Sequence, residues 1–188
     1  MVTSKVFSLI PTWNFQPEGP TRLRKKKKRE MQGHVSQDTL VGVPVALIWD
    51  VYRGLELGRL VDKLAPEVLG RVEFLEGDGG VGTIAKLTLP PGSPGRGYMK
   101  ERFTKIDDEN RVKETEVLEG GYKDLGFDVV RIRLEIVEKD SESCVVRSTI
   151  EYEGDEKLAD VVSHVNVKPL EMMAEIIGKH LCQNKSTL

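Results

Sequence analysis

Apolar and polar residues alternate along much of the chain after residue 31, a pattern typical of antiparallel strands that bury one face. The first such segment is "MQGHVSQDTLVGV", which begins at Met31. Six further segments follow: Val68 to Leu75, Gly82 to Leu89, Tyr98 to Ile106, Arg111 to Glu119, Phe127 to Val137 and Ser143 to Glu153. Turn-forming text such as "GDGG", "PPGSPGRG" and "DDEN" separates them. The pattern therefore predicts seven strands.

Apolar residues recur at helical spacing in three segments. The text "PVALIWDVYRG" predicts a short helix after the first strand, and Leu55 to Leu64 predicts a second one. The third helix, Lys157 to Cys182, is longer, and Pro169 is expected to bend it near the middle. Its apolar stripe consists of Leu158, Val162, Val165, Met173, Ile176 and Ile177. Together the elements predict an α+β fold, in which a curved seven-stranded antiparallel sheet wraps the long C-terminal helix.

The length of 188 residues suits one domain with a single core. The chain has no run of about 18 apolar residues, so no membrane-spanning helix is expected. Cys144 and Cys182 have no partners at metal-ligand spacing, which indicates neither a zinc site nor a disulfide framework. The apolar stretch near the N-terminus stops at Pro11, too early for a secretory signal, so a cytoplasmic location is expected.

Charge divides the chain into two parts. Residues 1–30 contain eight Lys or Arg and two Asp or Glu, a net charge of +6, so the remaining residues carry −8 of the total of −2. This balance argues against a nucleic-acid-binding surface on residues 31–188. We expect residues 1–30 to form a disordered basic leader, because prolines and like charges prevent burial. "RLRKKKKR" reads as a solvated tail, a leader before an internal start at Met31, or a nuclear-import or phosphate-binding patch.

Several motifs resemble one known family. They are "EGDGGVGTI" (76–84), "KERF" (100–103), "DDENRVKE" (107–114), "EGGYKDLGF" (119–127) and "SCVVRSTIEYE" (143–153). In this order they resemble the norcoclaurine synthase-like proteins of the major birch pollen allergen superfamily, over about residues 33 to 183. The resemblance implies the helix-grip fold, with an internal cavity for hydrophobic or aromatic molecules. It implies no metal and no cofactor.

The resemblance also implies an activity, the condensation of an aromatic amine with an aromatic aldehyde in a Pictet-Spengler reaction of alkaloid biosynthesis. That chemistry needs a proton donor near the aldehyde oxygen and a base that removes the aryl proton after ring closure. The family's catalytic lysine matches Lys113 and its glutamate matches Glu101, each within an aligned motif. The expected small-molecule partners are dopamine or tyramine and an aromatic aldehyde.

Two other catalytic positions of the family are changed. The family's tyrosine falls on Met99. The nearest tyrosine here, Tyr98, is a candidate catalytic residue or equally a sheet-surface aromatic, because it is one residue early and a one-residue step reverses the side-chain direction on a strand. The family's aspartate falls on Ile132, and Asp128 is a candidate replacement from the same face of its strand. The isoleucine at this place, the text "YMKERF" and the text "EGGYKDLGF" also resemble norbelladine synthase, a related branch that forms an imine. Imine formation without ring closure is therefore an alternative.

Glu101 and Lys113 face the same side of their hairpin if the "DDEN" turn leaves an odd number of unpaired residues, such as 108–110. They would then stand four ladder positions apart, roughly 13 Å. The alternative is that both are surface charges on a solvated sheet face. The residues expected to contact substrate are Met99, Phe103, Ile132, Leu170, Met173 and Ile177, although the last three equally suit core packing.

The same cavity also suits a noncatalytic carrier or receptor for hydrophobic ligands, such as a plant hormone, with a role in defence. Abscisic acid receptors share the fold, but residues 90–97 lack their gate sequence and residues 110–112 lack their latch. The loop "GDGGVG" lacks the Lys-Ser/Thr and helix of a phosphate cradle and predicts a tight hairpin with positive φ. His34, His164 and His180 are scattered and receive no role. A monomer or weak homodimer is expected.

Overall fold

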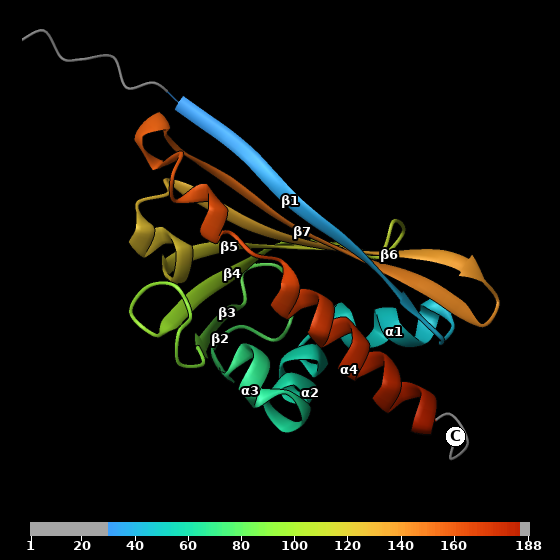
Figure 1. The fold of residues 1–188 in the computed structure, drawn as a ribbon. Coiled ribbons are helices and arrows are strands. Elements are labelled where there is room, and N and C mark those ends of the chain that lie inside the picture. The colour runs from blue at the N-terminus through green and yellow to red at the C-terminus, as the bar shows by residue number, and fades with distance from the viewer. Residues whose placement is uncertain (1–29, 185–188) are drawn as a thin grey trace, which may run out of the picture.

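A computed structural model describes residues 30–184, in which seven antiparallel strands form one curved sheet (Figure 1). The strands are β1 (Glu30–Val41), β2 (Arg71–Glu76), β3 (Ile84–Thr88), β4 (Tyr98–Asp107), β5 (Val112–Gly120), β6 (Val129–Asp140) and β7 (Ser143–Asp155). Their order across the sheet is β1-β7-β6-β5-β4-β3-β2, so β1 pairs with β7 and the other neighbours are consecutive in sequence. The seven predicted strands are confirmed.

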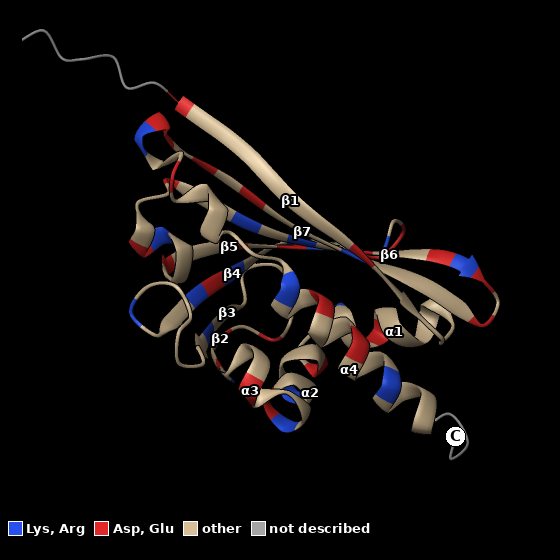
Figure 2. Ribbon diagram, viewed as in Figure 1, with Lys and Arg blue, Asp and Glu red and all other residues tan. Residues whose placement is uncertain are grey.

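Residues of both charge signs are distributed along the strands (Figure 2). Arg147 on β7 donates two hydrogen bonds to Asp38 on β1, of 2.8 and 2.9 Å. Arg131 on β6 lies 3.3 Å from Glu153 on β7. Because these pairs are exposed to solvent, each stabilises the fold by at most about 1 kcal/mol. These exposed pairs are surface charges that need no functional role.

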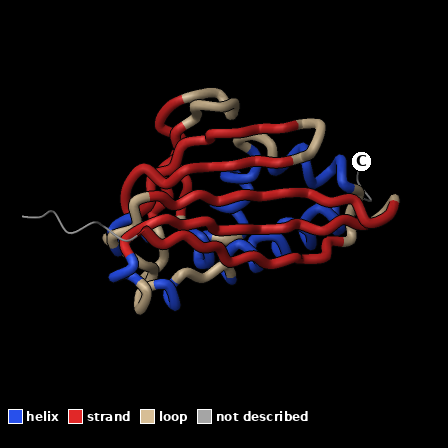
Figure 3. The backbone as a smooth tube through the Cα atoms, turned by 90° about the horizontal axis from the view of Figure 1, so that it is seen from above, coloured by secondary structure: helices blue, strands red, loops and turns tan. Residues whose placement is uncertain are grey.

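The helices lie on the concave face of the sheet, as the view from above shows (Figure 3). They are α1 (Val45–Tyr52), α2 (Glu56–Leu64), α3 (Pro66–Leu69) and α4 (Lys168–Asn184), with 3-10 turns at η1 (Gly121–Leu125), η2 (Glu156–Leu158) and η3 (Val162–His164). Apolar residues of the sheet and of the helices meet in one buried core. None of the described helices is both long and apolar enough to cross a membrane.

The predicted start of the last helix is wrong. The helix begins at Lys168 instead of Lys157, and the preceding segment forms the two 3-10 turns η2 and η3. Pro169 consequently occupies the first helical turn instead of the middle, a position where the missing N–H has no intrahelical partner to lose. A short helix, α3, also occupies part of the segment predicted to start a strand at Val68.

The prediction of a disordered leader at residues 1–30 lies outside the described residues, except for Glu30, which begins β1.

The α4 helix packs closely against β1 through a glycine. A Cβ atom added to Gly178 would lie 2.3 Å from Cγ1 of Val41, well inside contact distance. Ala174 and Ile177 on the same helix are fully buried, so the small residues set how near the helix approaches the sheet. This approach closes the concave face at the β1 edge.

The turn between β4 and β5 is tied to α1. The indole Nε1 of Trp49 donates a 2.9 Å hydrogen bond to Asp108, and Nη2 of Arg53, at the end of α1, donates one of 2.7 Å to the same carboxylate. The hairpin end and the loop after α1 are therefore held at a fixed distance. This contact positions two groups of the candidate site described below.

We predict that Gly178→Ala lowers the free energy of unfolding by about 1–2 kcal/mol, because overpacking against Val41 outweighs the gain in helix propensity. Val41→Ala in the same protein should remove the clash. The double variant should then lose at least about 0.5 kcal/mol less than the sum of the single variants, measured by urea denaturation. Additive losses would contradict the close approach.

Candidate active site

An apolar cavity of about 90 Å³ lies between the concave face of the sheet and the helices α2 and α4. This exceeds the roughly 10–15 Å³ that one water needs. Its walls consist of Leu57, Gly58, Val61, Leu69, Val72, Phe74, Ala85, Leu87, Met99, Glu101, Phe103, Lys113, Thr115, Ile132, Leu134, Leu170 and Met173. Glu101 and Lys113 are the charged residues in this wall, so the two predicted catalytic residues share one cavity.

A bulge in β4 brings the two side chains to the same face. The turn leaves four residues, 108–111, between the paired Asp107 and Val112, so the predicted odd turn is wrong. An even turn alone would place Glu101 and Lys113 on opposite faces, because side chains alternate along a strand. Thr104, however, is an extra residue in β4, because Phe103 pairs with Thr115 and Lys105 with Glu114. This bulge reverses the alternation once more, so that Glu101 and Lys113 point to the same face. Thr104 Oγ1 donates a hydrogen bond to the Glu114 carbonyl at 3.2 Å.

The amine of Lys113 is buried, with 2% of the residue exposed to solvent. Its Nζ donates a 3.1 Å hydrogen bond to the carbonyl of Gly54, in the loop between α1 and α2. It also lies 3.6 Å from the centroid of the Phe103 ring, a cation-π contact. Burial disfavours the ammonium form and lowers the pKa of Lys113 to about 8, while the charge of Glu101 opposes part of this change.

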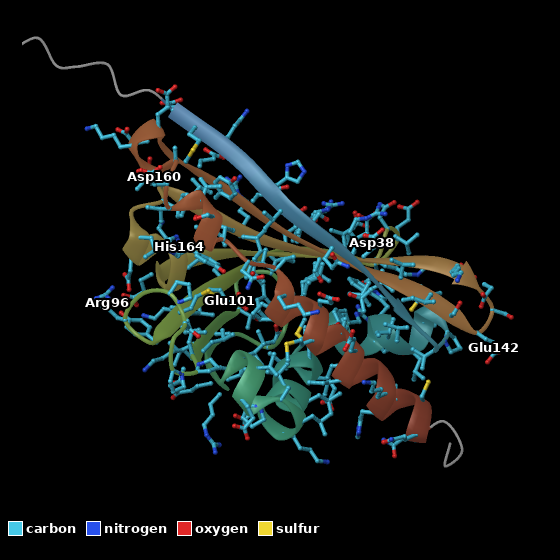
Figure 4. All side chains as sticks on the ribbon, in the orientation of Figure 1. Asp38, Arg96, Glu101, Glu142, Asp160 and His164 are labelled. Atoms are coloured by element: carbon cyan, nitrogen blue, oxygen red, sulfur yellow. The ribbon has the colours of Figure 1, made fainter. Side chains whose placement is uncertain are left out.

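The carboxylate of Glu101 accepts a 2.9 Å hydrogen bond from the hydroxyl of Thr115, on the neighbouring strand. Burial raises the pKa of Glu101, and the Thr115 bond and the Lys113 charge act in the opposite direction. Figure 4 places Glu101 between the sheet and the helices, whereas Arg96 lies at the periphery. The cavity thus holds a carboxyl group of raised pKa and an amine of lowered pKa, a combination suited to proton transfer near neutral pH.

Five of the six residues predicted to contact substrate line the cavity: Met99, Phe103, Ile132, Leu170 and Met173. Ile177 is fully buried but is not among the lining residues, so it belongs to the packed core. Ile177 therefore serves core packing, whereas Leu170 and Met173 line the cavity.

Tyr98 and Asp128 lie outside the cavity wall. The Tyr98 hydroxyl donates to Glu119 at 3.4 Å, and the guanidinium of Arg96 stacks 5.3 Å from its ring, both away from the cavity. Asp128 lies just before β6 begins, where its backbone N–H donates to the carbonyl of Glu153, and it lines a polar surface depression. Neither residue replaces the family's tyrosine or aspartate in the cavity. Tyr98 is one residue from the inward-facing Met99 and so points to the other face, and Asp128 lies before the first residue of β6.

The glycine-rich loop supports the site through its backbone hydrogen bonds to Phe103. Gly77, Gly79 and Gly82 have positive φ, as the predicted tight hairpin requires. Gly82 N–H donates to the carbonyl of Phe103 at 2.8 Å, and Phe103 N–H donates to the carbonyl of Thr83 at 2.9 Å. The loop therefore holds the backbone of the residue whose ring covers the Lys113 amine.

Two groups in the site were missed by the sequence reasoning. Thr115 shares the phase of Lys113 on β5, and the alternation along this strand could have placed it beside the cavity. The carbonyl of Gly54 has no signal in the sequence, since every residue has a backbone carbonyl.

Among the described residues, no three His, Cys, Asp or Glu side chains gather where they could hold a metal ion.

A second apolar pocket adjoins the cavity and shares four of its walls, Leu69, Met99, Ile132 and Leu170. Loop residues Pro90, Ser93 and Pro94 and the residues Tyr122, Asn166 and Pro169 surround it. The Tyr122 hydroxyl pairs with the backbone of Asn166 in both directions, at 3.0 and 3.2 Å. Arg96 donates three hydrogen bonds to Asp124, of 2.9 to 3.0 Å. These bonds fasten the β3–β4 loop and η1 around this end of the cavity.

We predict that Glu101→Gln moves the pKa of Lys113 below about 8, because the variant loses the negative charge that favours the ammonium. The titration can be followed by the NMR signal of the labelled Lys113 side chain. Glu116→Gln removes the same charge from the opposite face of β5 and is the matched control. An unchanged or raised pKa in Glu101→Gln would contradict the coupling.

The chain is similar to several known proteins. Norbelladine synthase of Narcissus pseudonarcissus is 46% identical over 156 residues, which cover 83% of this chain and 96% of that protein. S-norcoclaurine synthase 1 of Papaver somniferum is 36% identical over 162 residues, or 85% of this chain and 70% of that one.

Among solved structures, norcoclaurine synthase from Thalictrum flavum in complex with dopamine and hydroxybenzaldehyde superimposes with a TM-score of 0.73 and 31% identity, covering 82% of this chain and 88% of that one. The helix-grip fold expected from the sequence is therefore confirmed. The pathogenesis-related protein Bet v 1 family model matches residues 31–184. On these matches, the chain belongs to the Bet v 1 family.

Proposed function

We propose that the protein joins an aromatic amine of the dopamine or tyramine class to an aromatic aldehyde, through an iminium formed inside the cavity. The observation that carries this proposal is the placement of the Lys113 amine and the Glu101 carboxylate in one apolar cavity. The similarity to norbelladine synthase and to norcoclaurine synthases supports the choice of substrates. Apolar walls suit the aromatic rings of both.

Lys113 acts as the proton donor. The substrate amine attacks the aldehyde carbon and gives a carbinolamine, whose hydroxyl must leave as water before the iminium can form. A pKa of about 8 leaves most of the Lys113 amine protonated at neutral pH, yet makes it a stronger acid than an ordinary lysine. The Gly54 carbonyl and the Phe103 ring hold the ammonium in place within the wall.

Glu101 acts as the base for ring closure. In a Pictet-Spengler reaction the aromatic ring of the amine attacks the iminium carbon, and the ring carbon must then lose its proton. Burial raises the pKa of Glu101, which makes its ionised form a better proton acceptor than an exposed glutamate. The hydrogen bond from Thr115 fixes one carboxylate oxygen and leaves the other for the substrate.

Release of the open-chain imine without ring closure is the second candidate outcome. Of the described residues that line the cavity, Glu101 is the one acid, and Ile132 presents an apolar side chain where the resemblance places an aspartate. The 46% identity to norbelladine synthase favours the same outcome. The two outcomes share the iminium and differ only in the final step.

We predict that Lys113→Ala slows condensation by a factor of roughly 100 or more, as expected for the loss of a positioned acid. The test incubates purified protein with dopamine or tyramine and a panel of aromatic aldehydes, and separates the products by chiral chromatography. Lys100→Ala, which changes a lysine paired with Glu119 on the outer face, should leave the rate nearly unchanged. A protein that binds these ligands but never turns them over, in wild type as in Lys113→Ala, would be a carrier instead.

We predict that Ile132→Asp raises the ratio of cyclised product to open-chain imine, because it adds a second proton acceptor to the cavity wall. Ile132→Asn has nearly the same shape without the charge and is the control. Both ratios are measured on the same amine and aldehyde, after borohydride reduction of the open-chain imine. Equal ratios in the two variants would show that a missing carboxylate does not limit ring closure.

A further inference from the structure

The Lys113 amine also has the surroundings of a nucleophile. It is buried in the cavity wall, and in the described structure its one hydrogen-bond acceptor is the neutral carbonyl of Gly54. The neutral carbonyl holds the amine in position without forming an ion pair with it, in contrast with outer-face lysines such as Lys100, which pairs with the carboxylate of Glu119. A desolvated lysine in an apolar pocket is a recurring form of activated amine.

The cavity also favours the product of such a nucleophile. An imine forms with loss of water and is reversed by water, so a site with apolar walls, which bind water weakly, stabilises it. Apart from Glu101, Lys113 and Thr115, the wall is built of apolar side chains and one glycine. Glu101 lies in the same wall and can carry a proton between the attacking nitrogen and the departing oxygen.

We propose that Lys113 captures the aldehyde as a covalent, reversible imine when the aldehyde enters the cavity without the amine. The neutral Nζ attacks the carbonyl carbon and a C–N bond forms, while the proton lost by nitrogen passes through Glu101 to the carbonyl oxygen. The carbinolamine then loses its hydroxyl and the second nitrogen proton as water, which leaves a C=N bond between Nζ and the aldehyde carbon. No oxidant or reductant is needed. The inference depends on the proposed function only for the class of aldehyde.

The lowered pKa of Lys113 determines what fraction of the amine is neutral and able to attack the aldehyde. With a pKa of about 8, roughly a tenth of the Lys113 amine is neutral at pH 7 and about half at pH 8. Capture removes the ammonium that serves as acid in the condensation. An excess of aldehyde should therefore inhibit the enzyme, and the inhibition should grow as the pH rises through 8. The substrate amine relieves it by displacing Lys113 from the imine carbon.

Borohydride trapping with peptide mass analysis tests the proposal on the full chain. The protein is incubated with 4-hydroxyphenylacetaldehyde or 3,4-dihydroxybenzaldehyde alone, reduced with borohydride and digested. Reduction of the imine leaves Lys113 heavier by the mass of the aldehyde less one oxygen atom. Exposed Lys139 in the same digest is the internal control, so the result does not depend on a variant that folds. The labelling of Lys113 relative to Lys139 should be at least tenfold at pH 8.

Two further arms sharpen the test. Dopamine added before the reductant should reduce the label on Lys113 and leave the label on Lys139. Lys113→Arg and Lys113→Met should both lose the cavity label. Equal labelling of Lys113 and Lys139, or no label on Lys113, overturns the inference. Because the arm with aldehyde alone contains no amine substrate, it tests the capture separately from the condensation. A labelled Lys113 without condensation would remove only the proposed function, and condensation without label would remove only the capture.

Discussion

The burial of one cationic side chain among apolar groups is the constraint on which this site depends. An isolated ammonium in an apolar interior costs several kcal/mol, and the protein offsets only part of that cost. The Gly54 carbonyl, the Phe103 ring and the Glu101 carboxylate supply this compensation from the α1–α2 loop and from β4. The rest of the cost remains as the lowered pKa of Lys113, which is the property that the proposed chemistry uses. The same burial that destabilises the folded protein at Lys113 therefore makes its ammonium group a stronger acid.

The periodicity of the chain predicted the seven strands and the two short helices α1 and α2, because a half-buried strand and an amphipathic helix leave different spacings of apolar residues. It could not place the start of α4. The apolar residues Leu158, Val162 and Val165 have helical spacing, but two 3-10 turns direct them toward the core as a helix would. The spacing of apolar residues therefore does not distinguish these turns from a continuous helix. The position of Pro169 in the first turn was the available signal, since proline is tolerated there and not in a helix interior.

For the site, the family resemblance and the structure contributed different information. The motifs identified Lys113 and Glu101, and alternation along β4 places Met99, Glu101 and Phe103 on one face. The assumption of an odd turn was wrong, although the conclusion drawn from it agrees with the register. The sequence has no marker for a bulge at Thr104 or for a main-chain acceptor at Gly54, because both depend on how separate segments meet. Thr115 had a marker in its phase with Lys113, and that marker was overlooked.

The bulge at Thr104 has a consequence for how this hairpin tolerates insertions and deletions. Between the bulge and Lys113, the side-chain direction repeats every two residues. Adding or removing two residues therefore keeps Glu101 and Lys113 on the same face of the hairpin. A change of one residue within the paired part of β4 between the bulge and the turn would place Glu101 and Lys113 on opposite faces of the hairpin, so that Val112 or Glu114 would share the face of Glu101 instead. Variation in this paired segment among related chains should therefore come in even steps, or be matched by a change at the bulge itself.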